Sequence, residues 1–170
     1  MILRRETPID RAAIFAVHAA AFARPEEIVP PEARLVDELR HDGDIVSGLS
    51  IVAEVNSVVV GHVVCSRARI EDSASLGLGP LGVQSDHQRR GVGHALMHAV
   101  LAAADALDEP AVILLGDPGY YRRFGFMLAQ TLAVQPAHPE WTEHFQIRCL
   151  SAWVGSTRGT FHYAPAFDRM

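Results

Sequence analysis

One short stretch of the chain combines the residue types that bind small anions. It holds two arginines and two glycines within the run Gln88-Arg89-Arg90-Gly91-Val92-Gly93. An apolar run at 76–83 predicts a strand before it, and an alanine-rich run at 94–107 predicts a helix after it. At a helix N-terminus the first N–H groups lack partners and the dipole is positive, so phosphate binds there readily. The pattern indicates a phosphate site, although two glycines that merely begin a helix against a sheet are an equally simple interpretation.

Two other glycine-based phosphate motifs do not fit. Residues 77–82 match GxGxxG letter for letter, but these glycines precede the predicted turn. The acid that a dinucleotide site needs ~20 residues further on would be Asp105, inside the predicted helix. The GxxxxGK[ST] loop is absent. Neither dinucleotide binding nor nucleoside triphosphate hydrolysis is therefore expected.

A second group of reactive side chains, two tyrosines and two arginines, occupies residues 120–123, after a buried strand expected at Ala111–Leu115. Together the two segments resemble the GNAT superfamily of N-acetyltransferases. Residues 88–93 are similar to its (Gln/Arg)-x-x-Gly-x-(Gly/Ala) signature, and residues 121–126 to its Tyr-x-x-x-Gly-Phe segment. Residues 116–126 look similar to the bacterial YhbS-like acetyltransferases.

The resemblance implies an α/β (α+β) fold in one domain, residues 1–170. Its central mixed, mostly antiparallel sheet would have about six to seven strands, splayed at the acyl-CoA site and flanked by about four helices. The motif-bearing core would span about 1–128, with C-terminal strands in 129–170. The residue patterns predict helices from Thr7 and at 32–40, a hairpin at 51–65, and strands at 1–5, 131–135, 145–150 and 160–163.

The resemblance also implies an N-acetyltransferase that moves an acetyl or short acyl group from acetyl-CoA to an amine. The amine would attack directly, through a tetrahedral intermediate. The pantetheine arm would pair with the strand at Leu81 and Val83, whose neighbour Gly82 suits a β-bulge. The Val83 N–H would stabilise the oxyanion, and Tyr121 would protonate the leaving thiolate. The residues implied to bind the cofactor are Leu81, Gly82, Val83, Gln88, Arg89, Arg90, Gly91, Val92 and Gly93.

A general base is missing from the expected place. Many relatives carry a glutamate in the strand before the glycine turn, but residues 76–83 contain no titratable side chain. Candidates elsewhere, none of which stands out, are Glu26, Glu27, Glu54, His62, Glu71 and Asp72. An alkylamine has a pKa of ~10.4 and must lose a proton before it attacks. An α-amino acceptor, with a pKa of ~7.7–8.0, needs no dedicated base.

The acceptor, a small-molecule or peptide amine, is expected between residues 22–39 and the C-terminal strands. The acids of that region favour a cationic acceptor, unless they form a solvated helix face: Glu26, Glu27, Glu32, Asp37 and Glu38. The alternative function is a non-catalytic acyl-CoA sensor or partner-docking module of the same fold. A homodimer is a further expectation from the resemblance.

Composition excludes several other classes. The net charge of −5 argues against a nucleic-acid partner, and no apolar run reaches the ~18–20 residues of a membrane span. No secretory leader is recognisable, and Cys65 and Cys149 form no CxxC pair, so we expect a cytoplasmic protein with reduced thiols. His94 and His98 have helical spacing but lack an HExxH pattern, so no metal is expected.

Overall fold

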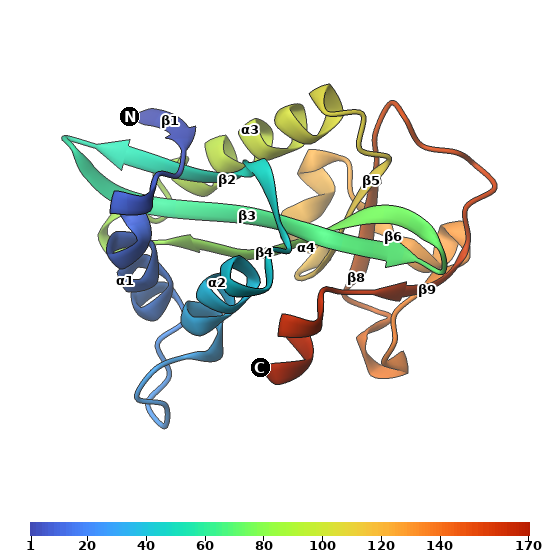
Figure 1. The fold of residues 1–170 in the computed structure, drawn as a ribbon, viewed down its shortest axis with the longest axis horizontal. Helices are drawn as coiled ribbons and strands as arrows, with labels where there is room; N and C mark the ends of the chain where they lie inside the picture. The colour runs from blue at the N-terminus through green and yellow to red at the C-terminus, as the bar shows by residue number, and fades with distance from the viewer.

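The computed structural model describes all residues 1–170 and has a nine-stranded sheet between two layers of helices (Figure 1). The strand order is β1-β2-β3-β4-β5-β8-β6, and β9 pairs with β3 and β7. Only β4–β5 and β7–β9 are parallel pairs. The predicted mixed, mostly antiparallel sheet is confirmed. It has more strands than predicted because several two-residue to five-residue strands from the C-terminal part join it.

The strands are β1 (Ile2–Arg5), β2 (Ile45–Val55), β3 (Val58–Ile70), β4 (Ser73–Val83), β5 (Ala111–Leu115), β6 (Met127–Leu128), β7 (Val134–Gln135), β8 (Phe145–Cys149) and β9 (Gly159–His162). The helices are α1 (Arg11–Ala21), α2 (Pro31–Asp42), α3 (Val92–Ala106) and α4 (Pro118–Tyr121). Short 3₁₀ turns include Pro8–Asp10, Arg122–Phe124, Ala129–Leu132, Pro139–Trp141 and Pro165–Arg169. No helix is both long and apolar enough to span a membrane.

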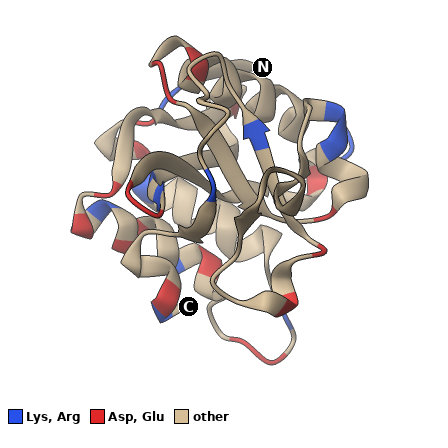
Figure 2. Ribbon diagram, turned by 90° about the vertical axis from the view of Figure 1, so that its right-hand side faces the viewer, with Lys and Arg blue, Asp and Glu red and all other residues tan.

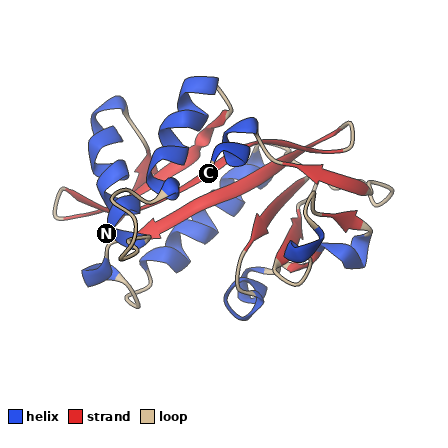
Figure 3. Ribbon diagram, turned by 90° about the horizontal axis from the view of Figure 1, so that it is seen from below, coloured by secondary structure: helices blue, strands red, loops and turns tan.

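Two apolar interfaces hold the helices on the sheet. Ile14 and Val17 of α1 pack with Val36 of α2 against one face, on valines of β2 and β3. Leu96 and Val100 of α3 pack into the larger core on the other face. Figure 3 shows helices on both sides of the long strands. Because each helix buries one apolar stripe, β3 and β4 are covered on both faces.

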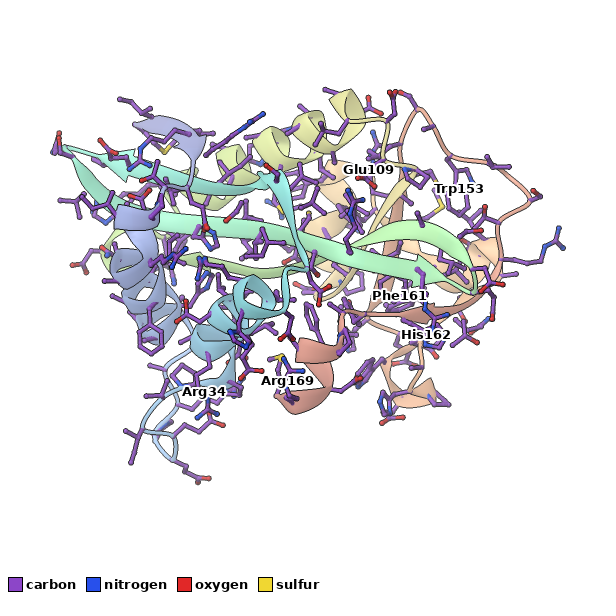
Figure 4. The ribbon with its side chains drawn as sticks, viewed as in Figure 1. Arg34, Glu109, Trp153, Phe161, His162 and Arg169 are labelled. Carbon is purple, nitrogen blue, oxygen red and sulfur yellow. The ribbon has the colours of Figure 1, made fainter.

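In the C-terminal part, the strands predicted at 145–150 and 160–163 are β8 and β9 within one residue, and one predicted strand is mostly wrong. Residues 131–135 form a strand only at Val134–Gln135, because a 3₁₀ turn ends at Leu132 and Ala133 has a left-handed φ of 54°. The short strand β6 was not predicted, since two residues show no periodicity. The last turn packs on α2 through an ion pair from Arg169 to Glu38, 2.9 Å long (Figure 4).

Candidate active site

Strands β4 and β5 diverge soon after they meet. They pair only at Leu76–Val112 and Gly77–Ile113. Beyond these pairs β4 continues to Val83, whereas β5 ends at Leu115. The second half of β4 therefore has β3 on one side and no strand on the other, a free edge to which an extended ligand can add.

The alternation of the strand determines which backbone groups line this free edge. The Gln84 N–H donates to the Val60 carbonyl of β3 over 2.9 Å. Since successive residues of a strand alternate, the N–H groups of Leu81 and Val83 point the other way, toward the free edge. The Val83 carbonyl already accepts a hydrogen bond of 3.0 Å from the Gln88 side chain.

The turn before α3 presents a series of unpaired donors. The N–H groups of residues 89–94 donate to no backbone carbonyl. Arg89 and Gly91 have left-handed φ values of 57° and 85°, which turn the chain into the helix. A Cβ on Gly91 would meet nothing within 4 Å, so the space beside its backbone is open. Arg89 and Arg90 are exposed at the same turn. Unpaired N–H groups, open space and positive charge together suit a phosphate.

Gly82 has a different role from the one predicted. The register of β3 and β4 shifts between Val63–Leu81 and Cys65–Leu78, so the bulge lies at Gly79–Pro80 and the prediction of a bulge at Gly82 is wrong. Gly82 pairs regularly with His62. Its missing side chain instead admits α1, because a Cβ there would lie 2.6 Å from the Nδ1 of His18.

Two neighbouring tyrosines of α4 face different parts of the site. The Tyr121 ring covers Gly116, at the end of β5, and a Cβ on that glycine would lie 2.3 Å from the ring. Burial, reinforced by Tyr120 and Asp117, raises the pKa of Tyr121 to about 12. Its hydroxyl is thus protonated at neutral pH and can donate a proton. The Tyr120 hydroxyl lies against Gly93, 3.1 Å from where a Cβ would be.

A pocket of about 680 Å³ opens beside the β4 bulge. Its wall is mainly aromatic, from the end of α1, from β9 and from the chain after β9. Phe161 and His162 on β9 are two of its residues (Figure 4). The aromatic side chains that line it are Phe22, Trp141, Phe145, Phe161, Tyr163 and Phe167. The carboxylates of Glu32 and Asp168 and the guanidinium of Arg69 also line it, so the pocket combines an apolar wall with charges of both signs.

The acids expected to attract a cationic acceptor mostly have partners of their own. Arg24 bonds Glu27 and Glu32, and Arg40 bonds Asp37. Of the five acids in that expectation only Glu32 lines the pocket. Figure 2 shows acids and arginines dispersed over the ribbon rather than gathered by sign. The acidic run is therefore mostly a set of surface ion pairs, and Glu32 both forms an ion pair and lines the pocket.

A series of hydrogen-bonded polar side chains, Glu6, Ser50, His62 and His18, connects β2 and β3 with α1. The Ser50 hydroxyl donates to Glu6 over 2.6 Å and lies 2.8 Å from Nε2 of His62. The Nδ1 of His62 lies 2.8 Å from Nε2 of His18. Both histidines are completely buried, and Nδ1 of His18 has no partner.

Comparison with known proteins agrees with this geometry. The profile of the acetyltransferase (GNAT) domain family matches residues 47–128. YhbS of Escherichia coli K12, described as an uncharacterized N-acetyltransferase, is 31% identical over 99% of both chains. The chain belongs to the GNAT family of acetyltransferases. This membership favours an enzyme over the binding module considered as the alternative.

Two solved GNAT structures resemble this one over nearly their full length. E. coli YhbS in complex with CoA superposes with a TM-score of 0.91, at 29% identity, and the match covers 99% of this chain and 92% of that one. A GNAT acetyltransferase of Brucella melitensis in complex with acetyl-CoA has a TM-score of 0.80 at 34% identity, with coverages of 98% and 97%. The GNAT fold predicted from the two motifs is thereby confirmed.

The structure brings most predicted site residues of this GNAT chain to one edge. Leu81, Val83 and the turn at 88–93 adjoin each other, and Tyr120 links α4 to that turn. Val92 is 4% exposed and its side chain belongs to the core, so only its N–H faces outward. Gln88 braces the turn on Val83 through its side chain.

Some site residues had no recognisable sequence pattern. Tyr163 lines the pocket and packs on Gly77, but no motif surrounds it. His18 lies in the apolar run of α1, where a histidine has no distinctive pattern, and its polar partner lies 44 residues away. The Nε2 atoms of His94 and His98 lie 3.0 Å apart, and both rings pack on Phe124. The chain has no group of three side chains that could hold a metal ion.

Proposed function

We propose that this chain transfers an acetyl or other short acyl group from acetyl-CoA to the nitrogen of an amine, by direct attack through a tetrahedral intermediate. The observation that carries the proposal is the free edge of β4, which leads to the unpaired N–H groups before α3. The ligands named in the two related structures, CoA and acetyl-CoA, are of the kind that such an edge and turn would bind. Residues 1–170 act as one domain in this proposal.

The cofactor would bind mainly to backbone atoms. Its pyrophosphate would lie on the N–H groups of residues 89–93, with Arg89 and Arg90 adding positive charge. Its pantetheine arm would pair with Leu81 and Val83 along the free edge. Gln88 would hold the turn in place, and Gly82 would keep the strand close to α1.

Two groups would promote the chemical step. The Val83 N–H faces the free edge and would donate to the thioester carbonyl, where negative charge develops during attack. The Tyr121 phenol would give its proton to the sulfur that leaves. The Tyr121 phenol is protonated at neutral pH, so its proton is available when the thiolate forms.

The acceptor would enter the aromatic pocket beside the β4 bulge. Its apolar wall suits an amine with an aromatic or aliphatic body, and the Asp168 carboxylate, which forms no ion pair, suits the positive charge of an ammonium group. This preference replaces the highly cationic acceptor expected from the acidic run. A small-molecule amine or the N-terminus of a peptide fits the same chemistry.

Release of free CoA thiol tests the proposal directly. Acetyl-CoA would be incubated with the protein and a panel of amines: aromatic and aliphatic monoamines, a polyamine, an aminoglycoside and short peptides. The chain contains no lysine, so acetylation of its own side-chain amines cannot contribute to the background. We expect thiol release that depends on the acceptor, strongest for monoamines with an apolar body. Tight acetyl-CoA binding without release for any amine would contradict the proposal.

A further inference from the structure

The hydrogen bonds from His18 through His62 and Ser50 to Glu6 each have a defined donor and acceptor. Arg40 bonds Glu6 over 3.1 Å, and Ser50 also donates to this carboxylate. Burial tends to raise the pKa of Glu6, but interactions with His62, Arg40 and Ser50 outweigh it and lower the pKa to about 2. Glu6 is therefore ionised at neutral pH and only accepts hydrogen bonds.

This ionised carboxylate determines where the protons of Ser50, His62 and His18 lie. The single Ser50 hydroxyl proton goes to Glu6, so Ser50 Oγ accepts from the N–H at Nε2 of His62. Burial lowers the pKa of His62 and of His18, which keeps both imidazoles neutral. Nδ1 of His62 then carries no proton and accepts from the N–H at Nε2 of His18. The lone pair of His18 Nδ1 is left free.

That lone pair faces the part of β4 where the reaction is proposed. Nδ1 of His18 would lie 2.6 Å from a Cβ on Gly82, the residue between Leu81 and Val83. It is buried and unpartnered, an arrangement that costs stability unless a donor arrives. The His18 ring also stacks on Phe22, at a centroid distance of 6.0 Å, and Phe22 lines the acceptor pocket. The free nitrogen thus lies against Gly82, and the ring that carries it stacks on one residue of the pocket wall.

We propose that His18 is the general base of this enzyme: its Nδ1 accepts, directly or through one water, the proton that the ammonium form of the acceptor must lose before its nitrogen attacks the acyl carbon. His62, Ser50 and Glu6 are positioning residues that hold His18 in the tautomer able to accept. The inference rests on the acyltransfer proposed above and supplies the base that residues 76–83 lack.

The proton balance of the step is simple. One N–H bond of the ammonium group breaks as its proton moves to His18 Nδ1, and the neutral nitrogen then forms its bond to the acyl carbon. The carbon–sulfur bond breaks, and the thiolate takes the Tyr121 proton. His18 is left as an imidazolium ion bonded to His62. It returns its proton to water after the product leaves, and Tyr121 is reprotonated by the second proton, which the nitrogen loses as the amide forms.

The groups around His18 predict how the rate depends on pH. His62 faces it from β3, with Glu6 and Arg40 beyond, and Asp10 contributes to the charge around His62. From β4 only Gly82 and its uncharged neighbours face it. Because burial holds the pKa of His18 below its usual 6.5, kcat at saturating acceptor should be level from about pH 7 upward.

The main test compares His18→Gln with wild type on two acceptors at pH 8. For a primary alkylamine, of pKa ~10.4, we expect kcat to fall by ~10²–10³-fold. For an α-amino acceptor, of pKa ~7.7–8.0, we expect a fall of less than ~10-fold, since much of it is already neutral. With the alkylamine, kcat of the variant should keep rising with pH. Exposed His41→Gln serves as the matched control and should behave as wild type.

Two further measurements protect the test against misfolding. His62→Phe leaves His18 in place but removes the acceptor of its Nε2–H, so we expect a smaller loss with the same dependence on acceptor pKa. Nitrogen-15 NMR of the wild-type imidazoles should show the proton on Nε2 of both His18 and His62. This measurement involves no catalysis, so it separates failure of the relay from failure of the proposed function.

Equal losses for the two amines in His18→Gln, or an unchanged level pH profile, would reduce His18 to a structural role and overturn the proposal. A proton on Nδ1 of free His18 would also overturn it. Wild-type protein that acetylates no amine would instead contradict the function proposed above.

Discussion

The two halves of the candidate site are built from different atoms. The cofactor half, residues 81–93, offers backbone N–H groups from one continuous stretch of chain. The acceptor half, the aromatic pocket beside the β4 bulge, is made of side chains from the end of α1, β9 and the last turn. A backbone site depends on local conformation and tolerates many side chains, whereas a side-chain pocket changes with each substitution. The same cofactor can therefore be used with many acceptors on one fold.

A charge in the cofactor half should have the largest effect. Gly91→Glu would bring a carboxylate toward the pyrophosphate and disturb several N–H contacts, raising the Kd for acetyl-CoA by ~10³-fold or more. Gly43→Glu is a matched control, since Gly43 has a similar φ of 81° and equally open surroundings at the end of α2. Calorimetry should show wild-type binding for the control. Wild-type binding by Gly91→Glu would mean that the phosphate lies elsewhere.

Removal of one hydroxyl should separate binding from chemistry. Tyr121→Phe deletes the proposed acid, and we expect kcat to fall by ~10²–10⁴-fold while the Kd for acetyl-CoA stays unchanged. Tyr120→Phe is the control, because its hydroxyl lies at the cofactor turn and should affect the Kd more than kcat. Unchanged turnover in Tyr121→Phe would remove it from the mechanism.

Low pH should destabilise the face of the sheet covered by α1 and α2 before the face covered by α3. Glu6 has a folded pKa of about 2, below its unfolded value of 4.5, so its contribution to stability is complete above pH 4.5 and is lost as pH falls toward 2. The contribution is about 3 kcal/mol. Denaturation across this pH range should show a shallower slope for Glu6→Gln. Amide exchange should open α1 and α2 earlier than α3, and simultaneous opening would contradict the comparison.

A change in the pocket wall should have the smallest effect. Phe167 stacks on Tyr163 at 4.4 Å and lines the pocket. Phe167→Ala should raise the KM for an apolar amine by ~10-fold, through lost apolar contact, and leave the Kd for acetyl-CoA unchanged. Val154→Ala, at an exposed position outside the pocket, is the control. Equal changes in KM and Kd would show that the halves are not independent.

Sequence patterns predicted the elements around the cofactor half closely. The strand expected at 76–83, the helix at 94–107 and the strand at 111–115 are β4, α3 and β5 within a few residues. Each has strong periodicity and is bounded by glycine or proline, both of which are local properties. The roles of Tyr121, Val83 and the turn residues remain predictions, and so do a homodimer and a cytoplasmic location.

The predictions were wrong or incomplete at residues whose surroundings depend on contacts between distant parts of the sequence. Gly82 was expected in a bulge, yet its empty side is occupied by His18 from a helix more than sixty residues earlier. His18 lies on the apolar face of α1 with Ile14 and Val17, and a histidine at such spacing does not reveal that its partner is His62. No spacing rule connects residues whose proximity depends on the packing of a helix over a sheet.

Residue types and spacing alone were enough to predict the family, the anion-binding turn and the order of the main elements, because these depend on local backbone conformation and short motifs. Only the tertiary structure revealed the aromatic pocket and the hydrogen-bonded series from Glu6 to His18. Both are assembled from side chains far apart in sequence, and the free lone pair of His18 depends on hydrogen bonds that form only when α1, β2 and β3 pack together.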